Sequence, residues 1–579
     1  MRQIRLIAAF VAAAVLLSAQ ESGMRALGAR RIELSTTGLT EFGANTGSYG
    51  RLLTSLRKLM AGSVFTVNLA GSERTAFMDW LRDHVHITNA MKYWAPDLKS
   101  HLEFFLEQQT PEGLYYDYYD PITDADNERL GVFDHRFWKI LPGGKVQLCR
   151  LPLEADLEYL MVEGVYHYWQ ATGDTSFVRK WLPALEKGMA YSMNDPLRWS
   201  RKFRLVKRAY TIDTWDFQHP PGATLAYNHE HPRSAQMEKE IFNIDQNTPM
   251  GIMHGDNSGM YAACRQLAAM HLALGDAADG QIWNAEAETF RARTNKVCWN
   301  GRFYSHFVED DPLPAHLSHI DWKNTLSLSN TYDVNRGLAT DPMAESIIQT
   351  YLDLKQKTRT ESFAEWFSIY PPVRPHFTGY TPGSYLNGNI LTIVAGELAK
   401  AAFQHGYEAY GVDILDRLAK MVEQRGGQLP APYHPDGTVD GGVPDNWGQA
   451  AVVSALIEGL AGVVDRGALF ESVEISPRWL AAGIDEADVT VAYGPSRKQV
   501  RYRYKIDRAA RGIRIDLSGD TKRYRLRLLL PENAAVASAR VGDAAVEPVI
   551  ETIRSSRYAV VDGALAGTAV IGLRYEDRR

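Results

Sequence analysis

Paired amphipathic helices, separated by long connections, constrain the fold of this chain more than any other feature. Residues 154–174, 256–276 and 389–427 carry apolar side chains at the i, i+3, i+4, i+7 spacing that places them on one helix face. Gly173, Gly275 and Gly406 interrupt these patterns, and glycine at such a position commonly ends a helix. Each stretch therefore predicts a helical hairpin.

The connections between the hairpins are long and rich in aromatic, proline and glycine residues. Connections of this length are uncommon in compact domains unless they serve a function. A solenoid of stacked hairpins would show a fixed short period, which is not visible here. We therefore expect a closed ring of hairpins over residues 75–465, an (α/α)6 barrel or a related incomplete toroid, with the loops over one end. The connections span residues 109–150, 196–255, 297–340, 355–388 and 425–446.

The pattern changes after about residue 470. In "KQVRYRYKIDR", apolar and aromatic residues at positions 500, 502, 504 and 506 alternate with charged ones, and "YRLRLLL" repeats this period of two. These are half-buried strands, so residues 470–579 are expected to form a small antiparallel β-sandwich. We expect it to cover the barrel wall rather than to capture carbohydrate. Residues 20–74 remain as an N-terminal lead segment.

The N-terminus predicts export. Arg2 and Arg5 precede the apolar run "LIAAFVAAAVLL", and Ser18-Ala19 offers small residues for cleavage. Residues 1–19 are therefore expected to be a secretory signal peptide, with an uncleaved anchor as the alternative. No later segment approaches about 18 uninterrupted apolar residues. The mature protein is expected to be soluble, and periplasmic or secreted.

Composition excludes some classes of ligand and favours others. The net charge is -6 and no long basic run occurs, so neither nucleic acid nor an anionic membrane is a natural partner. The 3 cysteines show no metal-ligand spacing and no disulfide framework. The 13 tryptophans and 28 tyrosines are more than a core requires, and their place in the connections suits flat, partly apolar ligands such as sugar rings.

The stretch "YTIDTWDFQHPPG" carries the first candidate catalytic groups. Asp213 and Asp216 lie around Trp215, and Phe217 follows. Aromatic neighbours exclude water and raise a carboxyl pKa, which favours the protonated form of a general acid. Hydrolysis of a glycosidic bond needs one such acid and a second, ionised carboxylate. Either aspartate could instead cap a helix or hold its loop.

Two motifs resemble known glycosidase families. "TWDF" resembles the "GWDF" stretch of trehalases and, more loosely, of processing α-glucosidases, which implies that Asp216 is the general acid beside Trp215. "WLRDHVHITNA", from Trp80 to Ala90, is similar to the Trp-x-Arg-Asp motif of glucoamylase-like and debranching-enzyme barrels. That resemblance implies that Arg82 and Asp83 bind sugar hydroxyls at the cleavage subsite, through charge-assisted hydrogen bonds.

The second catalytic carboxylate is expected in "DGGVPDNWGQAAVVSALIEGL", which resembles the Gly-rich loop and last inner helix of those families. They usually supply a glutamate there, and this loop has none. Asp445, next to Trp447, and Asp440, ahead of the glycines, both remain candidates for the base. Trp447 is expected to contact substrate.

A further segment, "GSYLNGNILTIVAGELA", resembles the Tyr-x-Asn-Gly segment of barrel glycosidases. That resemblance implies that Asn387 contacts substrate hydroxyls. A helix cap at Asn387 is the alternative, with Gly388 supplying an unusual backbone conformation.

Other readings remain open. "DNERLG", at residues 126–131, resembles the acidic "DERLG" of α-L-rhamnosidases, which share the barrel, although their preceding Cys-Pro-Gln-Arg type sequence is absent. A polysaccharide lyase would use a tyrosine or histidine base, for which Tyr380 and His376 are available. A glycan-binding protein without catalysis is a third reading.

One acidic stretch of the sequence carries possible ligands for calcium. Asp120, Asp124, Asp126 and Glu128 could offer oxygen ligands to it, but the glycine and terminal glutamate of an EF-hand loop are missing, so a solvated acidic turn is expected. We expect no metal site and no cofactor. Together these features predict an exported hydrolase that removes terminal sugars from a glycoside or oligosaccharide, and the resemblance to trehalase and glucoamylase-like barrels implies inversion and a glucoside-type sugar.

The Asp216→Asn variant should keep the fold and substrate binding but lose at least about a hundredfold in turnover, because a positioned proton donor is removed. Steady-state kinetics should show partial recovery on substrates whose leaving group needs no protonation. Full activity of this variant, together with loss of activity in Asp213→Asn, would assign the acid to Asp213.

Overall fold

The computed structural model describes residues 27–122, 135–211, 243–374, 381–444 and 446–578, and every structural statement below concerns these residues. The predicted signal peptide lies outside them. Within the described part of the chain, no helix is long and apolar enough to cross a membrane.

Helices that follow one another around a circle form the centre of the molecule. Each packs against the next, and the last of them, α16, packs back against the first, α3, so that the described helices close a ring. A short π-helical turn, η5 (Ala455–Leu460), continues α16. The inner helices are α3 (Leu81–Met91), α6 (Leu157–Thr172), α10 (His254–Ala273), α12 (Ser329–Asn335), α14 (Thr392–Gln404) and α16 (Asn446–Ser454).

A second set of helices lies outside this ring. Each of them from α4 to α15 follows an inner helix in the chain, whereas α2 precedes the ring in sequence and packs against α15 and α16. The N-terminal lead segment, residues 20–74, thus supplies one of the outer helices. The outer helices are α2 (Ser48–Ala61), α4 (Ser100–Glu107), α7 (Thr175–Asn194), α11 (Ala277–Cys298), α13 (Asp341–Thr358) and α15 (Glu408–Gln424).

Short turns join inner helices to outer ones, as the glycine pattern predicted. Gly173 ends α6 with φ of 68°, and the Asp174 side chain accepts the N–H groups of Ser176 and Phe177 at the start of α7. The sequence predicted both features: a glycine in the left-handed conformation that ends one helix, and an aspartate that caps the start of the next. Gly275 and Gly406 have positive φ in the turns after α10 and α14.

The long connections and the N-terminal segment contain short strands that the sequence did not reveal. Some of them pair as local hairpins, whereas others join segments far apart in the chain, where no local pattern marks them. The small sheets are β1 (Arg30–Arg31), β3 (Phe65–Leu69) and β4 (Ser72–Ala76); β5 (Tyr118–Pro121), β7 (Val146–Cys149) and β6 (Trp138–Ile140); β10 (Val308–Glu309), β9 (Met250–Ile252) and β8 (Arg208–Ala209); β11 (Leu326–Ser327) and β12 (Ile369–Tyr370); β13 (Pro430–Tyr433) and β14 (Val439–Pro444).

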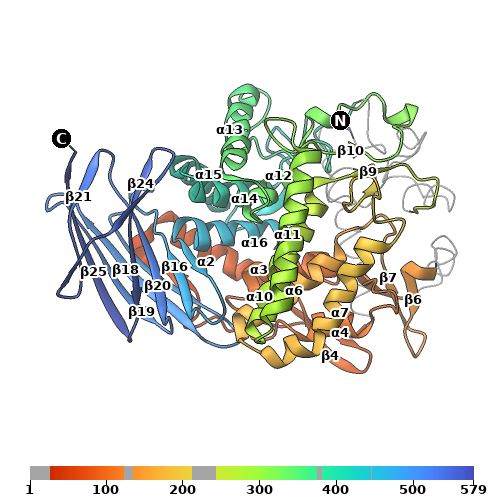
Figure 1. Cartoon of the computed structure of the whole chain (residues 1–579), viewed down its shortest axis with the longest axis horizontal. Coiled ribbons are helices and arrows are strands. Elements are labelled where there is room, and N and C mark those ends of the chain that lie inside the picture. The colour runs from red at the N-terminus through yellow and green to blue at the C-terminus, as the bar shows by residue number, and fades with distance from the viewer. Residues whose placement is uncertain (1–26, 123–134, 212–242, 375–380, 445, 579) are drawn as a thin grey trace.

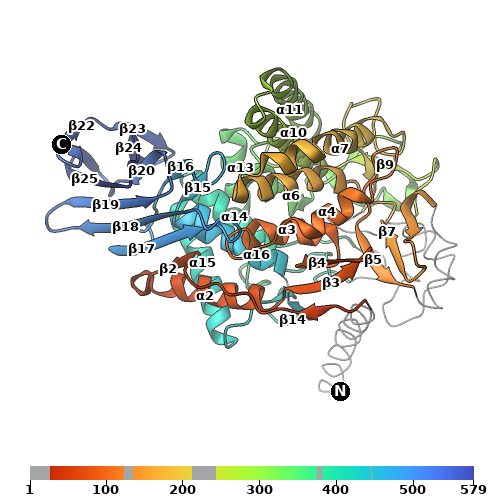
Figure 2. The same cartoon turned by 90° about the horizontal axis from the view of Figure 1, so that it is seen from below.

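Two larger sheets form the C-terminal part, which Figures 1 and 2 show at one end of the molecule. Neighbouring strands are antiparallel except for β16 and β20, and β18 alternates buried and exposed residues as predicted. One sheet has the order β15 (Val463–Asp465), β16 (Ser472–Ile475), β20 (Arg523–Leu529), β24 (Ser556–Ala564) and β23 (Val549–Ile553). The other has β2 (Glu41–Phe42), β17 (Glu486–Ala492), β18 (Gln499–Asp507), β19 (Gly512–Gly519), β25 (Thr568–Asp577), β21 (Ala534–Val541) and β22 (Ala544–Val546).

The sheets and the ring share a buried contact around Trp479. Its indole N–H donates to the hydroxyl of Tyr502 over 2.8 Å, and that hydroxyl donates to the carbonyl of Ala461 over 2.8 Å. Phe42 and Tyr49, from the N-terminal segment, pack their rings against Trp479 at 5.6 and 6.2 Å. The C-terminal strands therefore cover one side of the helical ring.

Gly396 on α14 lies where this inner helix approaches its neighbour α16 closely. A Cβ at this position would lie 2.4 Å from the carbonyl carbon of Ala451 on α16 and 2.5 Å from the nitrogen of Val452. Gly396→Ala should lower the free energy of unfolding by about 1–3 kcal/mol, although alanine has the higher helix propensity. Urea unfolding measures the effect.

Gly467→Ala is the matched control, because a Cβ there would meet no heavy atom within 4 Å. If both variants are as stable as the wild type, the close contact between α14 and α16 is not a constraint.

Candidate functional site

The long connections lie at one end of the ring. Five of them run from an outer helix to the next inner helix and end at the N-termini of α6, α10, α12, α14 and α16. Figure 1 shows strands of these connections, β6, β7, β9 and β10, on the side of the molecule away from the C-terminal strands. Helix N-termini carry partial positive charge, which favours carboxylates and other anionic groups. Most of the predicted site residues that the structure describes lie at this end.

Arg82, in the first turn of α3, lies in a buried ionic cluster. Its side chain is 4% exposed, and two of its nitrogens donate to the two carboxylate oxygens of Asp156 over 2.7 and 3.1 Å. The same guanidinium lies 3.1 Å from Glu154. Burial alone would raise the pKa of Asp156, but the positive charges of Arg82 and Arg208 hold it below its ordinary range. These donors of Arg82 are therefore used within the protein, where they order the carboxylates around them.

Asp117 joins the cluster from the connection that precedes β5. Its Oδ1 accepts the backbone N–H of Arg82 over 2.9 Å. Because Trp80 provides no side-chain cap for α3, Asp117 satisfies an N–H group that the helix start would leave unpaired. Burial raises the pKa of Asp117 to about 6, against the opposing positive charge of Arg82. A carboxyl group that titrates near neutral pH is typical of sites that exchange protons.

Aromatic side chains flank this cluster. The half-buried ring of Trp80 stacks on Tyr118, with centroids 4.3 Å apart. Trp447, in the first turn of α16, stacks on His86 of α3 at 4.0 Å, and its indole N–H donates to the hydroxyl of Tyr332 over 2.6 Å. Asp83 lies half-buried in the first turn of α3 and has partners of its own. The helix ends thus hold two stacked aromatic pairs beside buried acids.

Asp440, one of the two candidate bases, lies on β14 and is largely buried. Burial raises its pKa, while His434, 3.5 Å away, the backbone N–H of Tyr385 and the amide of Asn389 oppose that rise. Oδ2 of Asp440 makes no hydrogen bond to any described residue. Asn389 is fully buried, and its amide also forms no hydrogen bond of ordinary length within the described residues.

Asn387, predicted to contact substrate, has its amide occupied within the fold. Its Oδ1 accepts the backbone N–H of Val373 over 2.7 Å, and its Nδ2 donates to the carbonyl of Val373 over 3.1 Å. Asn387 therefore holds the connection between α13 and α14 in place. Asn389, two residues later and not singled out by the sequence, has the amide that lies near a candidate catalytic carboxylate.

His254, at the start of α10, belongs to a second buried group. Its ring nitrogens meet Asp333 at 2.5 Å and Ser327 at 2.9 Å, and it is fully buried. Arg208 on β8 lies 3.6 Å from Asp256 on α10. In the described part of the chain, the one group of side chains close enough to hold a metal ion is His271, Asp276 and Asp279. It lies at the turn between α10 and α11, away from this end.

Several predicted residues lie outside the described part of the chain. These include both aspartates of the "TWDF" region and one candidate base, and also the rhamnosidase-like stretch, most of the possible calcium ligands and the lyase candidates. They are Asp213, Trp215, Asp216, Asp445, residues 126–131, Asp124, Asp126, Glu128, His376 and Tyr380. Their roles remain predictions.

Glu154, Asp156 and Asp117 belong to the candidate site, although the sequence did not single them out. Glu154 and Asp156 directly precede the apolar stripe of α6, where acidic residues commonly occur for reasons of helix stability alone. One helix cap needs only one acidic side chain. The presence of two carboxylates, Glu154 and Asp156, ahead of α6 was the one signal in the sequence for a role beyond helix capping. Asp117 could not be identified, because its contact with α3 joins residues far apart in the chain.

Asp117 should impose a pH dependence on stability. Its pKa is raised in the fold, so the stability it contributes is complete below its unfolded pKa and is lost as the pH rises through about 6. Asp117→Asn keeps an acceptor for Arg82 but cannot ionise. Relative to the wild type, its free energy of unfolding should therefore rise by up to about 3 kcal/mol between about pH 4 and about pH 8. Urea unfolding at both pH values measures this.

Asp174→Asn serves as the control: the pKa of Asp174 is lowered, so the stability that its carboxylate contributes is complete above its ordinary pKa, and the difference from wild type should hardly change between about pH 4 and about pH 8. An unchanged difference between Asp117→Asn and wild type across this range would contradict the assignment.

Comparison with known proteins shows the fold. No protein-family model matches the sequence, and no curated protein matches it. An α-L-rhamnosidase from Dictyoglumus thermophilum aligns with a TM-score of 0.56 and 11% identity, over 94% of this chain and 50% of that one. A GH78 family rhamnosidase of Bacillus sp. GL1 aligns with a TM-score of 0.55 and 13% identity, over 87% of this chain and 43% of that one. This chain therefore spans half or less of the length of these relatives, and what it shares with them is the fold of two glycoside hydrolases.

Proposed function

We propose that this protein is a glycoside hydrolase that removes a terminal, glucoside-type sugar at the long-connection end of an (α/α)6 barrel. One observation carries the proposal. A buried cluster of Arg82, Asp117, Glu154 and Asp156 lies beside the stacked pair of Trp80 and Tyr118, at the end where the long connections meet the helix N-termini. Carboxylates order sugar hydroxyls and aromatic faces pack against sugar rings, so this combination suits a saccharide.

The reaction needs two carboxyl groups with different tasks. Asp216, by its resemblance to the trehalase motif, is the proposed acid. For the base, the sequence slightly favours Asp445, with Asp440 as a close second; Asp445 lies outside the described residues, and the surroundings of Asp440 support it as the base. Its Oδ2 has no hydrogen bond to a described residue, so this oxygen is suited to accept a proton from an attacking water. Burial raises the pKa of Asp440, and His434 and the amide of Asn389 oppose that rise, which limits the loss of the ionised form that a base requires.

Inversion is the proposed stereochemistry. It requires room for a water between base and sugar, and so a separation of roughly 6.5–9.5 Å between the two carboxyl groups. Asp440 belongs to the connection that ends at α16, whereas Asp216 belongs to the connection that ends at α10. Acid and base thus come from well-separated places around the ring, which suits a wide gap.

Export is part of the proposal and rests on the N-terminal sequence alone. A signal peptide over residues 1–19 would place the mature enzyme in the periplasm or outside the cell. N-terminal sequencing of the protein recovered from a periplasmic or culture fraction would test this, and an intact Met1 there would contradict cleavage.

An α-L-rhamnosidase is the second candidate. Two observations favour it: the fold is shared with two rhamnosidases, and residues 126–131 resemble the acidic motif of that family. The two candidates differ in the sugar that the same end of the ring accepts, so one set of substrates separates them.

The purified mature chain should hydrolyse an aryl α-D-glucoside and release the sugar with inverted anomeric configuration, seen by proton NMR at early times. Asp440→Asn should lower turnover by at least about a hundredfold without unfolding the protein. Asp436→Asn, on the exposed turn before β14 and bonded to Thr438, is the matched control and should remain active.

Preference for an aryl α-L-rhamnoside would favour the second candidate. Retained configuration, or full activity of Asp440→Asn, would overturn the mechanism or the base. Products that absorb in the near ultraviolet on a uronate-rich glycan would indicate a lyase, and binding without turnover on any substrate would indicate a non-catalytic glycan-binding protein.

A further inference from the structure

A cavity lies at the end of the helical ring opposite the long connections. Its volume is about 450 Å³, within the range of pockets for small molecules. Its walls come from the C-terminal parts of inner helices, including Lys92 after α3, His167 of α6 and Lys400 of α14, and from Asp465 and Tyr493 of the C-terminal part. It therefore lies between the ring and the sheets, away from the candidate active site.

A layer of side chains lies between the two sites. Trp447 stacks on His86 and donates to Tyr332, and Tyr332 also lines the cavity. The guanidinium of Arg336 lies over the rings of Tyr332 and Tyr159, at 5.0 and 5.2 Å. The cavity thus has a wall of its own toward the proposed catalytic end.

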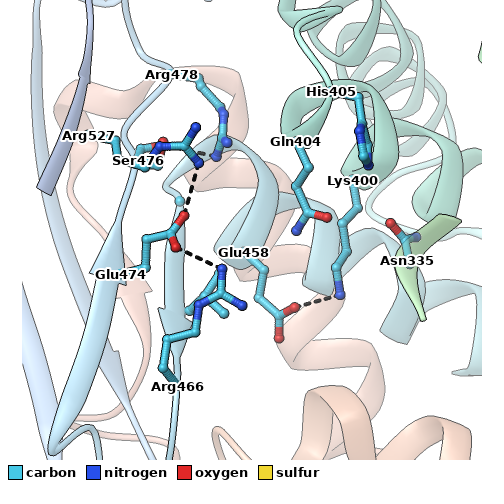
Figure 3. Close-up of a pocket in the computed structure, with 12 residues that line it drawn as sticks. Asn335, Lys400, Gln404, His405, Glu458, Arg466, Glu474, Ser476, Arg478 and Arg527 are labelled. Atoms are coloured by element: carbon cyan, nitrogen blue, oxygen red, sulfur yellow. Dashed lines mark hydrogen bonds and ion pairs between the residues drawn. The ribbon is translucent and has the colours of Figure 1, made fainter. Parts of the chain in front are cut away.

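The charges in the cavity wall are paired with one another. Glu458 lies 2.6 Å from Lys400 and 3.6 Å from Lys92. Figure 3 shows Glu458 and Lys400 pointing toward each other, and Arg466 reaching Glu474 in a neighbouring cavity that shares part of this wall. That contact measures 2.8 Å. A ligand with a net charge of either sign would therefore be repelled by the wall groups that carry the same sign of charge.

Several polar atoms of the wall have no hydrogen-bond partner among the described residues. His167 is 8% exposed, and neither of its ring nitrogens makes a hydrogen bond, although one lies 3.5 Å from Glu163. The amide oxygens of Gln266 and Asn335 are also unbonded. Buried polar atoms without partners are costly, so a ligand that supplies hydrogen bonds would be stabilised here.

Buried aromatic side chains complete the wall. Tyr93 and Tyr493 are stacked, with centroids 5.9 Å apart and planes 8° apart, and both line the cavity. Arg466, whose side chain is 57% exposed, and the exposed Arg265 also line it, which marks an opening to solvent.

We propose that this cavity binds a small, neutral, polyhydroxylated molecule of the size of a monosaccharide or disaccharide. Hydroxyl groups both donate and accept hydrogen bonds, and so match a wall in which ammonium groups, carboxylates, amides and an unbonded histidine alternate. A C–H face of such a ligand packs on the ring of Tyr166, which lines the cavity and is only half-buried. Nothing in this proposal requires the ring to hydrolyse a glycoside, so the site stands apart from the proposed catalytic function.

Ala262→Leu is the variant that tests the site. Ala262 is a half-buried residue of α10 that lines the cavity, and leucine would occupy part of its space. Ala285→Leu places the same side chain on an exposed position of α11 and is the matched control. His167→Phe, which removes both unbonded nitrogens at similar size, is a second variant that leaves the space unchanged.

Calorimetric titration should use D-glucose, D-mannose, L-rhamnose, myo-inositol, maltose and trehalose as probes, with inorganic phosphate and glucose 6-phosphate as anionic probes. At least one neutral probe should bind the wild type and Ala285→Leu. Ala262→Leu should remove one binding site per chain or weaken it at least tenfold, and His167→Phe should weaken the same site. Hydrolysis of the aryl glycosides, measured separately, should be unchanged in both variants.

The site is overturned if no neutral probe binds at millimolar concentration, if binding is the same in Ala262→Leu and wild type, or if only the anionic probes lose binding. Failure of the proposed hydrolase activity would appear only in the aryl-glycoside assay and would leave the titration result standing.

Discussion

A ring of helices is stable only if its last helix packs against its first, and the rest of this structure depends on that closure. α16 meets α3 on one side and α14 on the other, and all three are buried along most of their length. Helices with neighbours on several sides need small residues where backbones cross. Gly396 meets α16 so closely, and Gly259 meets the ring of Tyr159 so closely, that a Cβ would clash at either position. Closure therefore rests on tight packing between adjacent helices.

Closure also explains why the two ends of the ring differ in chemistry. Short turns at the C-terminal ends leave space that the C-terminal strands partly cover, and a cavity with paired charges remains there. The opposite end receives the long connections and the positive ends of the helices, where buried acids such as Asp156 and Asp117 are held by Arg82. One alternation of short and long connections, visible in the sequence, thus separates two polar sites within a single fold.

The sequence predicted those parts of the fold that repeat a local pattern. The hairpin turns at Gly173, Gly275 and Gly406 and the alternating strand β18 could be predicted because each is encoded within a few residues. α12 could not, and it lies within the range expected to be a connection. Its sequence "SNTYDVN" has no apolar stripe, yet it is buried because Asn330 bonds to the backbone of Tyr304 and Ser327 and Asn335 bonds to Glu397.

The candidate site could likewise be predicted only where a local motif marks a residue. Arg82 and Trp447 were identified by their motifs, but the partners that define their environment, Asp156 and His86, come from other segments. Asn387 and Asn389 illustrate the consequence. Both asparagines occur in one short stretch, and the partner Val373 of the first could be known only once the connection between α13 and α14 was placed. Residue type and motif indicate a candidate, and the fold decides which polar group is already occupied.

The N-terminal segment joins the two parts of the molecule that are synthesised last. The hydroxyl of Thr40 bonds to the backbone of Ala492, 452 residues away, while β2 pairs with β17 and α2 packs on α15 and α16. α2, the first of the described helices, therefore meets its helical partners α15 and α16 only after residues 408–454 have been synthesised. A fragment truncated before α15 would therefore lack both helices that cover α2 and leave its apolar face open to chaperones.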